Sequence, residues 1–167
     1  MTVDGVDIFI PQHGKKIYSH KFKKSGLRYE LCTCIKTGDI VWVNGPYPCG
    51  THNDIMIFRD SLMSHLSENE RVEADDGYIG ECPGHIKCPA HFTNNPRSRY
   101  MQQRVRNRQE TLNSRIKNFD ILRAMYRHSL ENHGDVVCVV LVIVQVAINN
   151  DKKLFDCKYR NMPYVYP

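Results

Sequence analysis

Two adjacent carboxylates in the stretch VEADDGYIGE, residues 72–81, are the first side chains whose type and spacing suggest chemistry. Like charges on neighbouring residues repel, so Asp75 and Asp76 need either surrounding water or a cation shared with other acids. The acids elsewhere in the chain that could share such a cation are Asp4 and Glu110, and a further acid, Asp54, lies at the start of an expected helix. Carboxylates are the ligands that Mg²⁺ and Mn²⁺ prefer, and a pair of such ions can drive phosphoryl transfer.

Each of these acids also has an ordinary structural explanation. Asp4 in VDG is typical of a turn or a strand end. Asp54 could complement the dipole of its own helix. Glu110 shares a helical stripe with Arg106 and Lys117, which could be an exposed ladder of ion pairs. Only the convergence of the acids on one cleft would favour a metal site.

The composition limits the class of protein. A chain of 167 residues with 41% hydrophobic and 25% charged residues is typical of one globular domain and excludes wholesale disorder. The net charge is +5, and the basic residues gather between Arg97 and Arg127, where the only acids are Glu110 and Asp120. Such a stripe favours polyanions, and it is equally consistent with a solvated helix face.

The seven cysteines are odd in number and follow no signal peptide, which indicates reduced thiols inside a cell. The residues Cys82, His85, Cys88 and His91 are zinc-ligand types, but their spacing matches no zinc motif, so ordinary structural roles are favoured. The apolar run DVVCVVLVIVQVAI is shorter than the roughly 18 to 20 residues of a membrane-spanning helix, so we expect no membrane partner.

The elements that must position the acids follow from hydrophobic periodicity. Strands are expected at residues 3–10 and 27–35, with IVWV returning as the partner of a hairpin and RVEAD as a short fourth strand. Residues 55–66 have helical spacing, 80–96 are expected to be loop, and from Arg97 onward Leu112, Ile116 and Phe119 approximate one helical seam. The valine-rich run could be strand or helix by periodicity. The order gives an α/β layering.

This order predicts where the acids meet. Sequential strands commonly neighbour each other, so the end of the fourth strand can lie beside the first strand. Asp75 would then lie near Asp4. Glu110 from a later helix would complete three carboxylates around one cleft.

Five segments carry a resemblance to a known family: VDG, SHKFKKSGLRYEL, IVWVNGPYPCGTHNDIMIFR, ADDGY and RVRNRQETLNSRIKNF. In this order they resemble the DDE catalytic domain of eukaryotic Harbinger-type transposases, often described as a DDE superfamily endonuclease, over nearly the full length. The last segment also has the Arg, three residues, Glu, six residues, Lys spacing of related bacterial insertion-sequence transposases, at Arg106, Glu110 and Lys117. Gln103 stands where that signature has a tyrosine.

The resemblance implies a ribonuclease H-like α/β fold over residues 1–167, with a mixed five-stranded sheet flanked by helices. In that fold the first Asp lies on the central strand, and the valine-rich run is a helix that covers the sheet. The residues implied as catalytic are Asp4, Asp75 and Glu110, and Asp54 is a fourth candidate metal ligand. The residues expected to bind DNA phosphates are Arg104, Arg106, Arg108 and Lys117.

The function implied is cleavage of DNA by a two-metal mechanism that needs Mg²⁺ or Mn²⁺. The alternative is a domesticated, inactive relative that binds only DNA or a partner protein. No helix-turn-helix precedes Asp4, so we expect the DNA-reading module to be absent from residues 1–167. The explanations are a fragment, a truncated gene model, or a system in which a separate protein partner reads the DNA. A homodimer and a nuclear location are further expectations from the resemblance.

Two local features complete the prediction. Asp76, where relatives often have lysine, would turn outward, and Gly77 would permit a sharp exit of the chain. In HGKKIYSHKFKK, lysines alternate with Tyr18, His20 and Phe22, which could contact a DNA backbone and stack on an unpaired base. A solvated loop held down by its aromatic residues is the other explanation.

Overall fold

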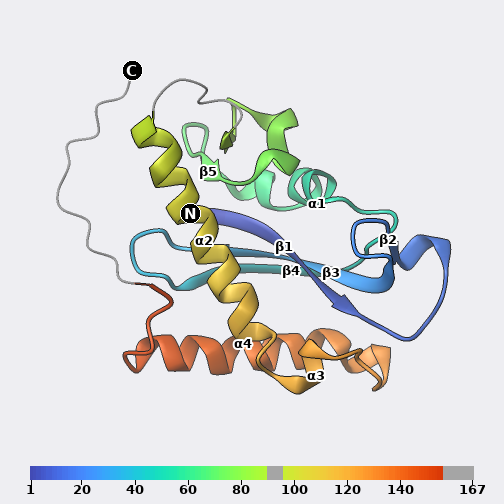
Figure 1. Ribbon diagram of the computed structural model, residues 1–167. Helices are drawn as coiled ribbons and strands as arrows, with labels where there is room; N and C mark the ends of the chain where they lie inside the picture. Colours follow the sequence, from blue (N-terminus) through green and yellow to red (C-terminus); the bar gives the residue numbers. More distant parts are fainter. Residues whose placement is uncertain (90–95, 156–167) are drawn as a thin grey trace.

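A computed structural model describes residues 1–89 and 96–155, and within helix α2 it leaves out the side chains of residues 96–99, 101–102 and 104–106. Its centre is a mixed sheet in the order β2-β3-β1-β5-β6, with β4 paired to β3 (Figure 1). The strands are β1 (Thr2–Phe9), β2 (Tyr18–Ser19), β3 (Lys24–Thr33), β4 (Ile40–Pro48), β5 (Val72–Glu73) and β6 (Ile86–Lys87).

The predicted hairpin is present, and β1 lies between antiparallel and parallel neighbours. β1 pairs antiparallel with β3 along its whole length, from Thr2 opposite Thr33 to Phe9 opposite Gly26. On its other side β1 pairs in parallel with β5 at a single position, Thr2 opposite Glu73. The first strand is therefore central in the sheet, as expected.

The sheet has six strands, so the prediction of five was wrong. The strands of the path β4-β3-β1-β5-β6 account for five of them. The additional strand is β2, which has two residues and pairs only with Ser25 and Lys24 at the beginning of β3. A strand of this length has no periodicity of its own, because it contributes only one residue to each face.

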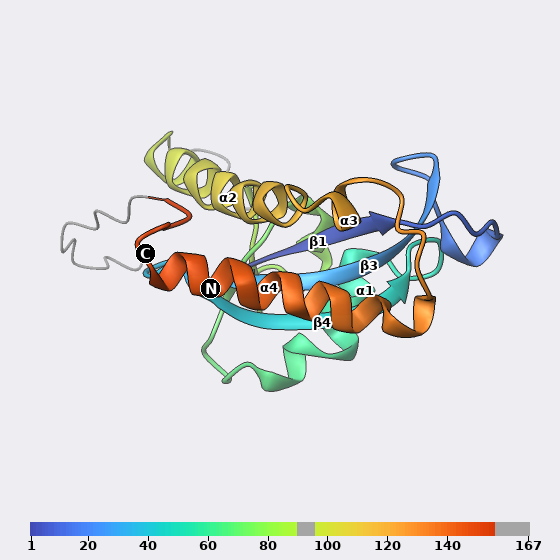
Figure 2. The same ribbon diagram turned by 90° about the horizontal axis from the view of Figure 1, so that it is seen from below.

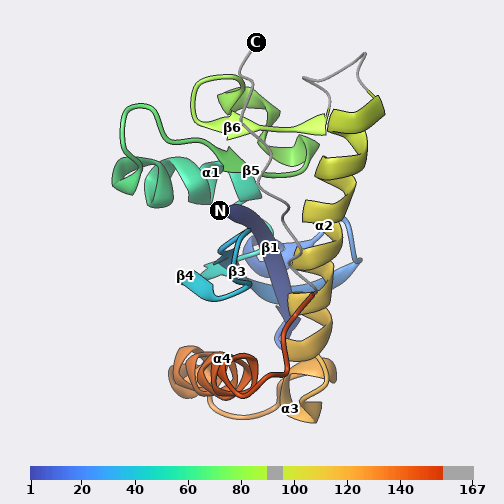
Figure 3. The same ribbon diagram turned by 90° about the vertical axis from the view of Figure 1, so that its left-hand side faces the viewer.

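Helices cover both faces of the sheet. α1 (Asp54–Asp60) lies on one face and α4 (His133–Asn149) on the other, while α2 (Pro96–Ile116) runs beside the sheet (Figures 1 and 3). The short helices are η1 (Lys15–Ile17), η2 (Leu62–His65), η3 (Asp76–Glu81), α3 (Asp120–Arg123) and η5 (Leu130–Asn132). The arrangement is a mixed α/β fold, as the sequence predicts.

Two apolar clusters fill the two sides of the sheet, because successive side chains of a strand point to opposite faces. On β1, Val3 packs with Phe58 and Tyr78 on the α1 side. Val6 and Ile8 pack on the other side with α2 and α4, through Leu112, Ile116, Val137, Val140, Leu141, Val144 and Ile148. The strand that carries Asp4 is therefore fixed from both faces.

The valine-rich run is helix α4, which confirms the expectation from the family resemblance (Figure 2). Together with η5 it forms a helical segment of 20 residues, Leu130–Asn149, which by length and composition alone is sufficient to cross a membrane, as many core helices also are. The prediction that the run is too short for such a helix was therefore wrong. Its buried side chains belong to the core beneath the sheet, whereas Val139, Val142, Ile143 and Val146 are exposed.

Two boundaries differ from the sequence prediction. The helix expected over residues 55–66 breaks at Ser61, which has φ −139° and separates α1 from η2. The stretch 80–96 was expected to be loop, yet its described part includes the end of η3 and all of β6. β6 adds the outer parallel strand to β5, through Val72 opposite Ile86 and Glu73 opposite Lys87.

Candidate active site

A pocket of about 240 Å³ lies where β1 and β5 separate after their single paired position. The carboxylates of β1, α1 and the segment after β5 reach this pocket, as does α2. Its acidic lining residues are Asp4, Asp7, Asp54, Glu73, Asp75 and Glu110. Its basic lining residues are Lys21, Arg28, Lys87 and Lys117. The four acids predicted as metal ligands therefore line one pocket.

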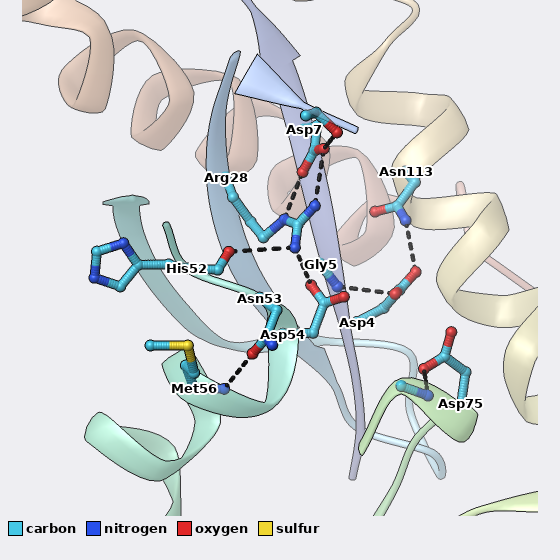
Figure 4. A network of polar contacts seen from close by, with 12 residues as sticks. Asp4, Gly5, Asp7, Arg28, His52, Asn53, Asp54, Met56, Asp75 and Asn113 are labelled. Atoms are coloured by element: carbon cyan, nitrogen blue, oxygen red, sulfur yellow. Dashed lines mark hydrogen bonds and ion pairs between the residues drawn. The ribbon is translucent and has the colours of Figure 1, made fainter. Parts of the chain in front are cut away.

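Asp4 lies on the central strand and is held by two neutral donors (Figure 4). The Gly5 N–H donates to Asp4 Oδ1 at 2.8 Å, and Asn113 Nδ2 donates to Asp4 Oδ2 at 3.0 Å. Nearby, Gln109 Nε2 fixes α2 to the sheet by donating to the carbonyl oxygens of Thr2 and Leu31. The orientation of Asp4 thus depends on how α2 is docked.

Asp54 is in the first turn of α1 and reaches over the backbone of β1. Asn53 caps the helix by accepting from Met56 N–H, so Asp54 is not needed as the cap. A Cβ on Gly5 would overlap Asp54 Oδ1, so any side chain at this position would displace that carboxylate oxygen. The glycine of VDG therefore provides the space through which Asp54 approaches Asp4.

Asp75 follows β5 and is the N-cap of η3. Its Oδ1 accepts from Gly77 N–H at 2.8 Å, and Asp76 is exposed, as expected. A Cβ on Gly77 would lie 2.9 Å from Asp75 Oδ1 and 3.9 Å from Asp54 Oδ2. A side chain at Gly77 would therefore press on the Asp75 carboxylate and would also contact Asp54, so both acids lie beside this glycine.

One face of α2 presents Glu110, Asn113 and Lys117 to the pocket. These residues are three and four apart, which places them on one stripe of a helix. Glu110 is exposed at the edge of the pocket, whereas Asn113 contacts Asp4 directly. Asn113 was not among the residues predicted from the sequence, although its position between Glu110 and Lys117 on one helical stripe indicates that it faces the same way.

The prediction of phosphate-binding arginines needs one correction. Arg108 is only 4% exposed, its guanidinium donates to the carbonyl oxygen of Ile35 at 2.7 Å, and it lies over the ring of Phe155. DNA cannot reach this buried cation, so Arg108 is not a DNA-binding residue. The side chains of Arg104 and Arg106 lie outside the described residues. Lys117 lines the pocket.

The crowding of carboxylates changes their acidity. Burial, followed by the charges of Asp54 and Asp75, raises the pKa of Asp4 to about 6. Burial also raises the pKa of Asp54, with the Arg28 guanidinium opposing and the charges of Asp7 and Asp75 adding to the shift. Both shifts favour the neutral acid, which is the effect of like charges gathered in a poorly hydrated site.

Arg28 of β3 holds the other side of the site. Its Nε donates to Asp7 Oδ1 at 2.7 Å and its Nη2 to Asp7 Oδ2 at 3.0 Å, while its Nη1 lies 3.3 Å from Asp54 Oδ1 (Figure 4). Asp7 and Arg28 are directly opposite each other in the antiparallel register. Although burial opposes its charge, the hydrogen bond to Asp7 raises the pKa of Arg28.

The donor set fits a hard divalent cation by type, because it consists of carboxylates with an amide nearby. In the described part of the chain, Asn113 Oδ1 is buried and accepts no hydrogen bond, and Asp54 Oδ1 accepts none but lies 3.3 Å from Arg28 Nη1. Over residues 1–89 and 96–155, however, no three His, Cys, Asp or Glu side chains are arranged closely enough to hold one ion. A cation would have to draw the carboxylates closer together.

The possible zinc ligands do not form such a site either. Cys82 Sγ and Cys88 Sγ lie 3.0 Å apart as free thiols, and burial raises the pKa of Cys82 to about 11. Among the described residues His85 Nδ1 has no hydrogen-bond partner, and His91 lies outside them. The described part of CPGHIKCPAHF offers no group of three metal ligands.

Comparison with protein families now identifies the group. The family model described as DDE superfamily endonuclease matches residues 3–145, which is most of the chain. The chain belongs to the DDE superfamily endonuclease family. Searches of curated proteins and of solved structures gave no match. The family places the chain among nucleases and transposase-derived hydrolases that act on DNA and generally use divalent metals.

Proposed function

We propose that this DDE superfamily endonuclease cleaves DNA phosphodiester bonds with Mg²⁺ or Mn²⁺, and that the pocket between β1 and β5 is its active site. The observation that carries the proposal is the convergence of Asp4, Asp54 and Asp75 from three separate elements, with Glu110 at the rim. Family membership further supports a ribonuclease H-like fold, in which acids meet beside the central strand.

The chain's own residues would act as follows. Asp4, Asp75 and Glu110, with Asp54, would hold the metal, which when bound activates a water and stabilises the departing oxygen. Asn113 orients Asp4, and Arg28 limits the movement of Asp54. Lys117 and Lys21 would neutralise the phosphates that enter the pocket.

Asp75→Asn provides the direct test. The change keeps the size of the side chain and removes its charge, so nicking of supercoiled plasmid DNA in Mg²⁺ should fall by about 100-fold or more, beyond the usual effect of losing an outer-shell partner of a metal. Asp76→Asn is the matched control, because it removes an adjacent but exposed carboxylate and should nick like the wild type.

The controls make the outcome decisive. Nicking by the wild type must stop in EDTA and return with Mg²⁺ or Mn²⁺. Undiminished nicking by Asp75→Asn, with full loss in EDTA, would assign the cleavage to another protein or another site.

The inactive, DNA-binding relative is the second proposal, and one observation favours it. The described acids are not gathered to within the reach of one ion. Binding by electrostatics alone would weaken steeply as salt rises and would not respond to divalent metal beyond ionic strength. A homodimer, a separate DNA-reading protein and a nuclear location remain predictions from the family.

A further inference from the structure

The turn between β2 and β3 places an exposed aromatic ring at the rim of the acidic pocket. Phe22 lies within the turn formed by residues 20–23, it is 42% exposed, and it lines the same pocket as Asp4 and Asp75. A single exposed phenylalanine is common on protein surfaces. Its position at the mouth of a pocket lined mainly by charged residues is what needs an explanation.

Phe22 is supported from below by a second ring. Phe9, at the end of β1, meets it edge to face, with the ring centroids 5.7 Å apart and an angle of 70° between the planes. Phe9 is itself fixed in the sheet opposite Gly26. The contact with Phe9 restricts the position of the Phe22 ring, while 42% of Phe22 stays exposed and accessible to a ligand.

Lysines from two separate segments surround this aromatic pair. Lys21 Nζ lies 5.2 Å from the centroid of Phe22, and the Nζ atoms of Lys24 and Lys117 lie 5.1 and 5.9 Å from the centroid of Phe9. Lys21 and Lys117 also line the pocket. An exposed aromatic ring with lysines beside it is a combination by which proteins bind single-stranded nucleic acids.

We infer that Phe22 is a stacking platform for an unpaired base next to the phosphate held in the pocket, with Lys21 and Lys117 on the flanking phosphates. A base inside a duplex is covered on both faces by its neighbours, so only an unpaired or extruded base can stack on the ring. The inference rests on the proposed function and narrows its substrate to DNA that is unpaired at the site of cleavage.

Binding without metal tests the inference separately from cleavage. The probe is a single-stranded DNA 12-mer with 2-aminopurine, a base whose fluorescence is quenched by stacking, measured in EDTA against a duplex of the same sequence. Phe22→Ala should bind the single strand about 10-fold more weakly, by the usual size of one stacking contact. Its affinity for the duplex should be unchanged, and the quenching should disappear.

Two variants separate stacking from loss of structure. Phe22→Trp should keep the quenching, and Phe22→Leu, which retains an apolar contact with Phe9, should lose it while melting at the temperature of the wild type. Val142→Ala is the control for removal of an exposed apolar side chain, on α4 at the far side of the sheet, and should behave like the wild type.

The inference is overturned if Phe22→Ala and Phe22→Leu bind and quench like the wild type, or if wild-type protein shows no preference for the single strand. Neither result depends on nuclease activity. Conversely, loss of quenching in Phe22→Ala together with metal-independent nicking in the plasmid assay would uphold the stacking site and overturn the metal-dependent mechanism.

Discussion

Asp4 and Asp7 lie three residues apart on the same strand, yet the fold treats the two carboxylates differently. Asp7 accepts both arms of the Arg28 guanidinium and the hydroxyl of Ser19, so its charge is balanced inside the protein. Asp4 accepts only neutral N–H groups from Gly5 and Asn113 in the described contacts and has two other carboxylates nearby. The fold supplies an ion pair to Asp7, whereas the charge of Lys21 is the smallest influence on the pKa of Asp4. This difference supports the proposal that Asp4 binds a metal cation.

Removing the internal cation should have the largest effect. Arg28→Met removes the ion-pair partner of Asp7. The Asp7 carboxylate would then be charged and unpaired in a buried position, because the side chain of Asp7 is only 2% exposed. Breaking a buried ion pair in this way typically costs about 3–5 kcal/mol of the free energy of unfolding. Urea denaturation at pH 7 measures the loss.

The surface pair of Arg59 and Glu81 provides the control for Arg28. The side chain of Arg59 is 46% exposed, so Arg59→Ala should cost less than about 1 kcal/mol. If Arg28→Met were no more destabilising than Arg59→Ala, the contrast between Asp7 and Asp4 would be wrong.

Gly5→Ala, which adds a methyl group to β1 between Asp4 and Asp7, should have the next largest effect. Here the affected property is nuclease activity. In Gly5→Ala the new Cβ would overlap Asp54 Oδ1, so the Asp54 carboxylate must shift from its position in the pocket. We expect plasmid nicking in Mg²⁺ to fall by about 100-fold, the upper end of the effects seen when groups around a metal are disturbed.

Gly84→Ala is the matched control for Gly5, because its Cβ would have only the carbonyl oxygen of Glu81 nearby, at 3.7 Å. It should nick at the wild-type rate. Full activity in Gly5→Ala would show that Asp54 is not needed in the pocket.

Asp4→Asn, which removes the charge of the Asp4 carboxylate, should have the smallest effect. This substitution should increase the free energy of unfolding. The pKa of Asp4 is raised to about 6 in the folded state, above about 3.9 for a free aspartate, so ionised Asp4 costs stability above pH 6. That cost falls as the pH falls through 6 toward 4. Asp4→Asn should therefore raise the free energy of unfolding at pH 7 by about 2 kcal/mol in metal-free buffer.

The gain in Asp4→Asn should shrink as the pH is lowered from 7 to 4.5, since wild-type Asp4 then becomes neutral. Asp76→Asn, at an exposed neighbour of the site, should show no such trend. A gain that is the same at both pH values would contradict the assignment of the raised pKa to Asp4.

The sequence predicted the parts of this site that depend on local patterns. The first strand, the hairpin, the helical stripe of Glu110 and Lys117, and the convergence of Asp4, Asp75 and Glu110 follow from periodicity and element order. The place of Asp54 in the pocket was implied only by the family resemblance. Arg108 was predicted to bind DNA, although its spacing in the sequence already indicated a buried position. It lies four residues before Leu112 and eight before Ile116, on the buried seam of α2.

The partners of the acids could not be predicted in the same way. Arg28 faces Asp7 because of the register between β1 and β3, and register is decided by the packing of both strands at once. The need for Gly5 arises from the docking of α1, which lies about 50 residues further along the chain. Strands as short as β2 and β6 are stabilised by their neighbours and have too few residues for a pattern.

Asp75 serves two purposes with one side chain. Its Oδ1 holds the first turn of η3 by accepting from Gly77 N–H, while the same carboxylate lines the pocket. A ligand that recruits this oxygen competes with the turn, so occupancy of the pocket and the order of η3 are thermodynamically linked. If a ligand takes this oxygen from the turn, the Gly77 amide hydrogen should exchange faster with solvent. Its exchange rate therefore reports whether the pocket is occupied.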